Sequence, residues 1–258
     1  MPIVKNDYPI LEYDTKKRAV IEPGRDGKGN LPKICVITFF QEVLEQFIEK
    51  CGAEAVFDYE SEMRNFPIYA CAYKGVHFCV TQATVGAGSI AMQTDYLFGN
   101  GVNTLLACGS CGVLTEIPEG AVILPVCALR DEGASYHYLP PSRTIALDED
   151  IIGVLEKTLE VNGTPYIKCM TWSTDAFYRE TPDMVEYRKQ EGCRVVEMEC
   201  STIAAVARFR EKKFGQLLYS GDILADAANY DDRDWYNNIS AREKLFYLTV
   251  EAAVTLAE

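Results

Sequence analysis

Two adjoining stretches decide the fold: KICVITF at residues 33–39 and EVLEQFIEK at residues 42–50. The first is a short apolar run rich in β-branched residues, which is typical of a buried strand. The second places apolar residues on one face of a helix, with charged residues between them. A buried strand that leads directly into an amphipathic helix is typical of an α/β domain.

The same alternation of strand and helix patterns continues along the chain. Lys74-Gly75 separates two strand patterns and predicts a hairpin. We find no internal repeat and no interior linker, so residues 32–258 are predicted to form a single three-layer α/β domain with a mixed central β-sheet flanked by helices. Further strands are expected at 68–73, 76–83, 103–108, 121–129, 166–172, 195–198 and 214–220, and helices at 89–100, 149–163, 182–192, 199–212 and from about 241.

Residues 1–31 form a polar N-terminal arm that ends in a glycine-rich stretch at 23–29. One interpretation is a lead-in segment that lies on a neighbouring subunit. The other is a loose tail. The sequence does not decide between them.

The charge balance narrows the choice of partners. The formal net charge is −13, whereas nucleic-acid binding depends on basic residues that neutralise phosphates. Attraction to an anionic membrane surface is excluded for the same reason. We therefore expect a small-molecule substrate or another protein subunit, and neither nucleic acid nor a membrane as partner.

Cysteine usage indicates the compartment. Most of the ten cysteines stand inside apolar, strand-like runs, where free cysteine behaves as a small hydrophobe. The first residues lack the pattern of a signal peptide, and no segment has the roughly 20 apolar residues of a membrane span. We expect a cytoplasmic protein. Cys108 and Cys111 have no matching second pair, and the chain has only two histidines, so no metal site is expected.

Ligands of open α/β sheets bind beyond the carboxyl ends of the strands, and small polar segments follow two of the predicted strands. Thr84 and Gly86 lie between a strand and a helix, where glycine allows close approach and the helix start offers free N–H groups. Ser110 follows the strand at 103–108 within Cys108-Gly109-Ser110-Cys111-Gly112. Either segment can serve an anion or a sugar oxygen, but ordinary tight turns have the same composition.

The most informative segment is Val195-Val196-Glu197-Met198-Glu199-Cys200. Two carboxylates flank a methionine where a buried strand becomes a helix, and burying a carboxylate is costly unless it is paired. A carboxylate can accept two hydroxyl hydrogen bonds at once, which suits the cis hydroxyls of ribose. Glu199 can also cap the following helix, but capping does not explain a doubled acid in so apolar a run.

Two further strand ends carry candidate residues. Phe177 follows the strand that ends at Trp172 and can form a stacking wall for a planar base, although core packing is the commoner use of phenylalanine. Asp222 follows the last predicted strand in Ser220-Gly221-Asp222. It stands where a general acid can protonate a departing base.

The segments GAGS (86–89), GSCG (109–112), STDAFY (173–178), VVEME (195–199) and SGD (220–222), in this order, resemble the nucleoside phosphorylase superfamily. The likeness runs from about Lys33 to the end of the chain. It includes the spacing between Phe177, Glu199 and Asp222. The resemblance implies cleavage of the bond between a base and ribose by phosphorolysis, giving free base and ribose 1-phosphate.

The resemblance also implies roles for individual residues. Glu199 would hold the ribose hydroxyls, with Met198 lying against the sugar, and Asp222 would be the general acid. The base would lie against Phe177, Cys111, Gly112 and Glu197.

The resemblance implies a phosphate site as well. Phosphate would bind Ser110, Gly86, Thr84 and Arg130, together with Arg64, which hexameric members of the family lend to a neighbour's site. No cofactor is implied, since inorganic phosphate is the co-substrate. The family further implies a homo-oligomer, either dimer or hexamer.

Three departures from the family pattern matter. Phosphorylases carry a Gly-Asp-Pro loop with an arginine after the first strand, where this chain has residues 38–43, and an arginine before GSCG, where it has Ala107. Arg130 or Arg143 can replace the missing arginines. Uridine-specific members carry glutamine and arginine after the aromatic, where this chain has Thr181 and Asp183. With Asp222 present, a purine is favoured over uracil.

Two alternatives stay open. A hydrolytic nucleosidase of the same superfamily would use a glutamate after the first strand to activate water, and Glu42 occupies that place. Glu42 can equally be an acid favoured by the helix dipole. The second alternative is a non-catalytic nucleoside-binding protein. A proton donor such as Asp222 argues against it, because binding alone does not require one.

Overall fold

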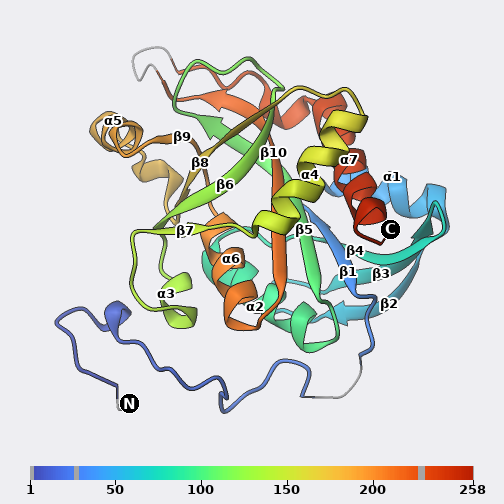
Figure 1. Ribbon diagram of the computed structural model, residues 1–258, viewed down its shortest axis with the longest axis horizontal. Coiled ribbons are helices and arrows are strands. Elements are labelled where there is room, and N and C mark those ends of the chain that lie inside the picture. Colours follow the sequence, from blue (N-terminus) through green and yellow to red (C-terminus); the bar gives the residue numbers. More distant parts are fainter. Residues whose placement is uncertain (1–2, 26–28, 226–229, 258) are drawn as a thin grey trace.

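A mixed sheet of ten strands organises the computed structural model, which describes residues 3–25, 29–225 and 230–257 (Figure 1). Its strands are β1 (Ile34–Thr38), β2 (Glu54–Tyr59), β3 (Phe66–Tyr73), β4 (Val76–Gln82), β5 (Thr104–Val113), β6 (Val122–Asp131), β7 (Thr144–Ala146), β8 (Tyr166–Thr174), β9 (Cys193–Glu197) and β10 (Lys213–Ile223). The helices are α1 (Gln41–Cys51), α2 (Ala87–Gly99), α3 (Ser135–Tyr138), α4 (Glu149–Val161), α5 (Pro182–Gln190), α6 (Cys200–Phe209) and α7 (Ile239–Ala257), with short 3₁₀ turns η1 (Pro9–Leu11), η2 (Phe177–Arg179) and η3 (Trp235–Asn237).

The sheet has two parts that share β5. Strands β5, β10, β6, β8 and β9 pair in a closed ring. β1 pairs with residues 104–108 of β5, before β9 pairs with residues 112–113, and β4, β3 and β2 extend outward from β1. β1 is parallel to both β4 and β5, and β10 is parallel to β5. β3 and β4 form the predicted hairpin, in which Lys74 (φ 49°) and Gly75 (φ 81°) adopt the left-handed conformation of a two-residue turn.

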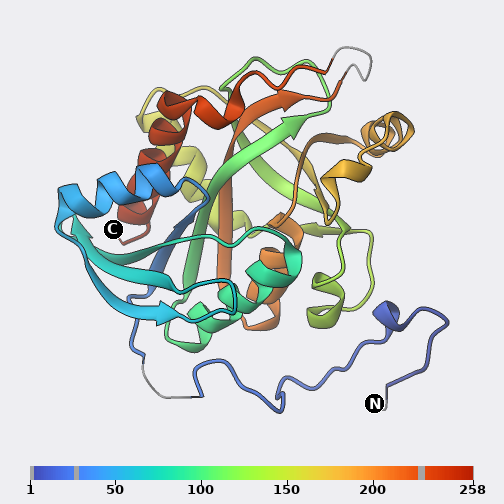
Figure 2. The same cartoon turned by 180° about the vertical axis from the view of Figure 1, so that it is seen from behind.

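Helices flank the sheet as predicted (Figures 1 and 2). α1, α4 and α7 pack together, and Phe47 of α1 meets Phe246 of α7 edge-on, with ring centroids 5.1 Å apart. α2, α3 and α6 form a second group around α6. α6 is almost entirely buried, and most of its residues are apolar or small. The observed architecture is the single mixed α/β domain that the sequence predicts.

Two of the predicted loops are wrong. Ser110 and Cys111 continue strand β5, and Gly221 and Asp222 continue strand β10 beyond its predicted end at Ser220. The reason is tertiary: β5 and β10 pair with each other across these residues, with Tyr219 opposite Ser110 and Ser220 opposite Cys111. Hydrogen bonding between two strands therefore overrides the turn preference of their small residues. Strand β2 was also not predicted, because its edge position leaves most of its residues exposed.

The described part of the arm, residues 3–25 and 29–31, follows the outside of its own chain (Figure 2). Lys17 forms an ion pair with Glu211, and Leu31 is buried, with its N–H bonded to the carbonyl of Asn100. Val20 is 99% exposed. Residues 26–28 of the glycine-rich stretch lie outside the described residues. Contact of the arm with a neighbouring subunit stays a prediction.

All ten cysteines are free, and most are buried. Within the part of the chain that the structure describes, no helix is both long enough and apolar enough to cross a membrane.

Packing between β10 and α4 gives a matched pair of tests. A Cβ added to Gly215 would come within 2.4 Å of Ile151 Cγ2 and 2.9 Å of Leu155 Cδ1, whereas a Cβ on Gly153 of α4 would meet nothing within 4 Å. We expect Gly215→Ala to lower the free energy of unfolding by about 1–3 kcal/mol through overpacking. Gly153→Ala should raise it by about 0.5–1 kcal/mol, since alanine favours the helix. Urea denaturation measures both, and equal effects would contradict the packing described.

Candidate functional site

Glu197 anchors the end of β9. Its buried carboxylate accepts hydrogen bonds from the hydroxyls of Ser173 (2.5 Å) and Thr171 (3.2 Å) and from the backbone N–H groups of Glu199 (2.7 Å) and Cys200 (2.6 Å). A carboxylate offers about four lone-pair positions, so these four donors use its capacity. Glu197 therefore holds the junction between β9 and α6, and no oxygen is left for the base contact that we predicted.

Glu199 is different. Only 6% of the residue is exposed, and only backbone groups bond its carboxyl group: Oε1 accepts the N–H of Gly86 at 2.6 Å, and the backbone of Met198 also donates to it. Burial, reinforced by the charge of Glu197, raises the pKa of Glu199 to about 8. Glu199 is the N-cap residue of α6, but its side chain makes no capping hydrogen bond to the helix. A buried carboxyl group that is bonded only by backbone groups is suited to receive a ligand's hydroxyls.

The segment before α2 meets Glu199. Gly86 has φ 90° and precedes the helix, and its N–H serves Glu199 rather than standing free for phosphate as we predicted. Thr84 donates its N–H to Gln93 Oε1 at 2.9 Å. The hydroxyls of Thr84 and Ser89 are buried with no hydrogen-bond partner among the described residues. Thr84 thus offers a hydroxyl, not an amide, to a ligand.

Asp222 lies on the side of the site away from Glu199. Its Oδ2 accepts the hydroxyl of Tyr230 at 3.2 Å, and burial raises its pKa. A Cβ added to Gly112 would lie 3.0 Å from Val196 Cγ1 and 3.2 Å from Asp222 Oδ1, which places the carboxyl group beside β5 and β9. Burial, and then Asp222, raise the pKa of Glu180 to about 8. Both neighbouring carboxyl groups thus have pKa values above their ordinary ones.

Cys111 connects the two sides. Its buried thiol donates to the carbonyl of Tyr219 at 3.4 Å. Burial raises the pKa of this thiol, and the charges of Cys169, Glu197 and Asp222 add to the effect. Cys111 is therefore a neutral, small side chain between the end of β9 and Asp222.

Residues 175–180 complete the arrangement. Burial raises the pKa of Asp175, which accepts the N–H of Gly133 at 2.8 Å and itself raises the pKa of Glu199. At the other end of the segment, Glu180 adjoins Asp222. Phe177 stands between these ends and is 51% exposed. The two ends of the segment thus interact electrostatically with Glu199 and with Asp222, and the half-exposed Phe177 lies between them in the sequence.

The arginines predicted to bind phosphate are engaged elsewhere. Arg130 is buried, and its guanidinium donates to Ser135 Oγ (2.9 Å), Ser142 Oγ (2.7 Å) and the carbonyl of Pro140 (2.9 Å). It holds residues 135–142, so its proposed phosphate role is a misassignment. Arg143 forms an exposed ion pair with Glu191.

Arg64 also has contacts within its own chain. This exposed arginine donates to Gln82 and lies over the ring of Phe66, 4.6 Å from its centroid. A contact with a neighbour's phosphate site stays a prediction.

Sequence reasoning missed three residues. Glu180 and Tyr230 adjoin Asp222, and Arg242 binds the predicted water-activating residue Glu42, with Nη1 and Oε1 2.5 Å apart. Glu180 and Tyr230 stand outside the family motifs, and Arg242 lies in a helix far along the chain. No local pattern signals these contacts.

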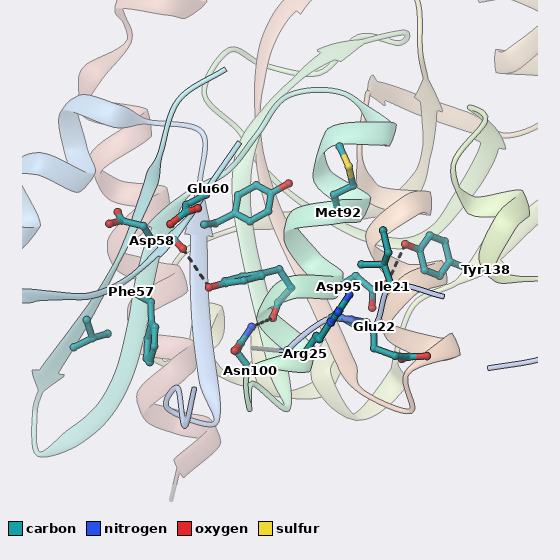
Figure 3. Close-up of a pocket in the computed structure, with 15 residues that line it drawn as sticks. Ile21, Glu22, Arg25, Phe57, Asp58, Glu60, Met92, Asp95, Asn100 and Tyr138 are labelled. Carbon is teal, nitrogen blue, oxygen red and sulfur yellow. Dashed lines mark hydrogen bonds between the residues drawn. The ribbon is translucent and has the colours of Figure 1, made fainter. Parts of the chain in front are cut away.

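Figure 3 shows a separate cavity of about 920 Å³. The arm lines it through residues 21–25, together with residues 56–60 around β2 and side chains of α2 that include Met92 and Asp95. None of the predicted site residues lines it. We therefore place the chemistry at the strand ends, where the polar groups converge, and not in this cavity.

Comparison with known proteins agrees with this geometry. A model of the phosphorylase superfamily matches residues 33–254. The guanosine phosphorylase of Halorubrum lacusprofundi is 27% identical over 209 residues, covering 80% of this chain and 86% of that relative. The solved purine nucleoside phosphorylase of Toxoplasma gondii, in complex with immucillin-H, has a TM-score of 0.75 at 17% identity and covers 88% and 92% of the two chains. The AMP nucleosidase of Bacteroides thetaiotaomicron has a TM-score of 0.72 at 20% identity and covers 88% and 90%.

The fold and the strand-end site thus define a protein of the nucleoside phosphorylase type. The chain belongs to the phosphorylase superfamily, as its motifs predict.

The buried carboxyl group of Glu199 yields a stability test. Its pKa of about 8 lies above the ordinary glutamate value, so the folded state binds an extra proton between these two values and loses stability as pH rises through this range. We expect Glu199→Gln to raise the Tm at about pH 8, by about 2–4 °C for each kcal/mol by which the free energy of unfolding increases. At about pH 5.5 the same substitution should raise the Tm less. Differential scanning calorimetry measures this, with exposed Glu243→Gln as control. A pH-independent difference would contradict the burial described.

Proposed function

We propose that this protein cleaves purine nucleosides by phosphorolysis, giving the free base and ribose 1-phosphate. The observation that carries the proposal is the presence of two carboxyl groups of raised pKa at the strand ends: Glu199, which is buried and bonded only by backbone groups, and Asp222. Asp175 and Glu180, at the two ends of segment 175–180, interact electrostatically with Glu199 and with Asp222. The names of the relatives, among them a guanosine phosphorylase, support the substrate class.

In the proposed reaction the two carboxyl groups act at opposite ends of the nucleoside. Glu199 as carboxylate accepts hydrogen bonds from the ribose 2′ and 3′ hydroxyls, with Met198 against the sugar. A phosphate oxygen forms a bond to C1′ as the bond from C1′ to the base nitrogen breaks. Asp222 donates its proton to a ring nitrogen of the departing base and is reprotonated from solvent. Phe177 covers the base. No cofactor is needed, because phosphate is the nucleophile.

The hydrolytic alternative requires Glu42 to take a proton from water. The fold likeness to an AMP nucleosidase is compatible with it. However, the carboxylate of Glu42 is engaged in an ion pair with Arg242. A non-catalytic binding protein has no use for a carboxyl group beside the base. Both observations favour phosphorolysis.

We further propose that the protein works in a reducing cytoplasm as a homo-oligomer, a dimer or a hexamer. Ten free cysteines support the compartment. Exposed Arg64, next to Met63, which is 66% exposed, supports a contact with a neighbouring subunit.

Product analysis tests the proposed reaction. We expect inosine or guanosine with phosphate to give free base and ribose 1-phosphate, uridine to react poorly, and omission of phosphate to stop turnover. Liquid chromatography and mass spectrometry identify the sugar product. Free ribose would instead establish a nucleosidase, and the absence of any product would indicate a binding protein.

Replacing Asp222 tests its role as an acid. We expect Asp222→Asn to lower kcat by roughly 10²–10⁴-fold, with nucleoside affinity largely kept. Because the acid must be protonated, wild-type kcat should fall as pH rises through its raised pKa, and the variant should lose this dependence. Asp150→Asn, an exposed acid on α4, is the matched control. Wild-type turnover by Asp222→Asn would overturn the assignment.

A further inference from the structure

The proposed phosphate site lacks a cation where the family places one. Residues Phe39-Phe40 stand after β1, and Ala107 stands in β5 before Ser110. Phe40 and Ala107 are fully packed into the core. A phosphate dianion is normally held by arginine or comparable donors. Since Arg130 and Arg143 are engaged elsewhere, the positive charge has to come from another element.

Arg242, near the start of α7, is buried at this edge of the sheet. It is 5% exposed, and its guanidinium lies over the rings of Phe40 (4.8 Å to the centroid) and Tyr236 (5.1 Å). Nη1 donates to Glu42 Oε1 at 2.5 Å and to the carbonyl of Tyr236 at 3.0 Å. Nε is buried without a hydrogen-bond partner among the described residues. The guanidinium therefore keeps unused donor capacity.

The surroundings of Tyr219 place Arg242 near Ser110. The ring of Tyr219 lies 5.8 Å from that of Phe40, and Tyr219 stands opposite Ser110 in the pairing of β10 with β5. Burial raises the pKa of the Tyr219 phenol to about 12, against an opposing effect of Arg242 and a hydrogen bond with Ser110. The Tyr219 phenol thus interacts with the buried Arg242 and with Ser110, the serine that the family motif assigns to phosphate.

Glu42 is the more exposed partner in the ion pair with Arg242. Its side chain is 35% exposed, whereas that of Arg242 is 6% exposed. A buried guanidinium requires an anionic partner, because a charge left unpaired in the interior is strongly destabilising. An anion that arrives from solvent can take the place of Glu42, which can turn outward into water at small cost.

We propose that Arg242 binds the phosphate co-substrate and that Glu42 is the anion that holds Arg242 while the phosphate site is empty. The assignment rests on the proposed phosphorolysis and moves the phosphate cation from the loop after β1 to helix α7. Glu42 then has the role of an exchangeable partner instead of a water-activating base.

The test compares two opposite substitutions. We expect Arg242→Gln to raise the KM for phosphate by about 10- to 100-fold, the effect of losing a charged hydrogen bond, and to change the KM for inosine little. Glu42→Gln should lower the KM for phosphate, because it removes the competing anion. Arg143→Gln, which breaks an exposed arginine–glutamate pair of the same kind, should leave both values unchanged.

Phosphate binding without nucleoside separates this inference from the proposed function. The Tm of the wild-type protein should rise with added phosphate, and Arg242→Gln should lose this response. The double variant Glu42→Gln, Arg242→Gln leaves no buried charge unpaired and should also lose it, so a folding defect of the single variant does not obscure the result. If the wild-type protein binds phosphate but forms no ribose 1-phosphate, the proposed function fails alone.

Two results would overturn the inference. One is a normal phosphate response and phosphate KM in Arg242→Gln, which would leave the ion pair a purely structural contact. The other is loss of turnover in Glu42→Gln with unchanged phosphate affinity, which would identify Glu42 as a base.

Discussion

The burial of two carboxyl groups at the end of β9 is the constraint on which the site depends. Taking a carboxylate out of water is costly unless donors replace the lost hydration. Glu197 has four such donors, and they tie β8, β9 and α6 together. Glu199, two residues on, is bonded only by the backbone of Gly86 and Met198 and by no side chain. The hydrogen-bonding capacity of Glu197 is thus used by the protein, while Glu199 keeps capacity for a ligand.

Pairing of β10 with β5 closes the ring of strands and brings the Asp222 side of the site toward the Glu199 side. β10 pairs with β5 through residues that look like loops in the sequence, and this pairing places Asp222 beside the small residues of GSCG. Gly112 has to stay without a side chain, since a Cβ there would lie 2.6 Å from Leu224 Cδ1 and 3.0 Å from Val196 Cγ1. Glycine is required at this position because three strands approach one another closely, and not because the chain turns there.

The buried arginines Arg130 and Arg242 have different roles, because they have different partners. Arg130 is surrounded by hydroxyls and carbonyls that belong to one loop, so its donors are used for structure. Arg242 instead faces a half-exposed acid and retains a buried N–H without a partner. The same residue type at similar burial therefore has a different capacity to bind an anion, and only the arrangement of partners distinguishes the two.

The sequence by itself determined the α/β class and most strands and helices, because these depend on local periodicity, and it singled out the acids Glu199 and Asp222 as candidates. Tertiary structure alone decided that residues 109–112 and 221–222 are strands, that Glu197 is fully hydrogen-bonded, and that Glu42 meets Arg242. Those outcomes depend on contacts between residues far apart in the chain. A local sequence pattern shows which side chains are able to bind a ligand. Only the folded chain decides which of their hydrogen-bond donors and acceptors stay free.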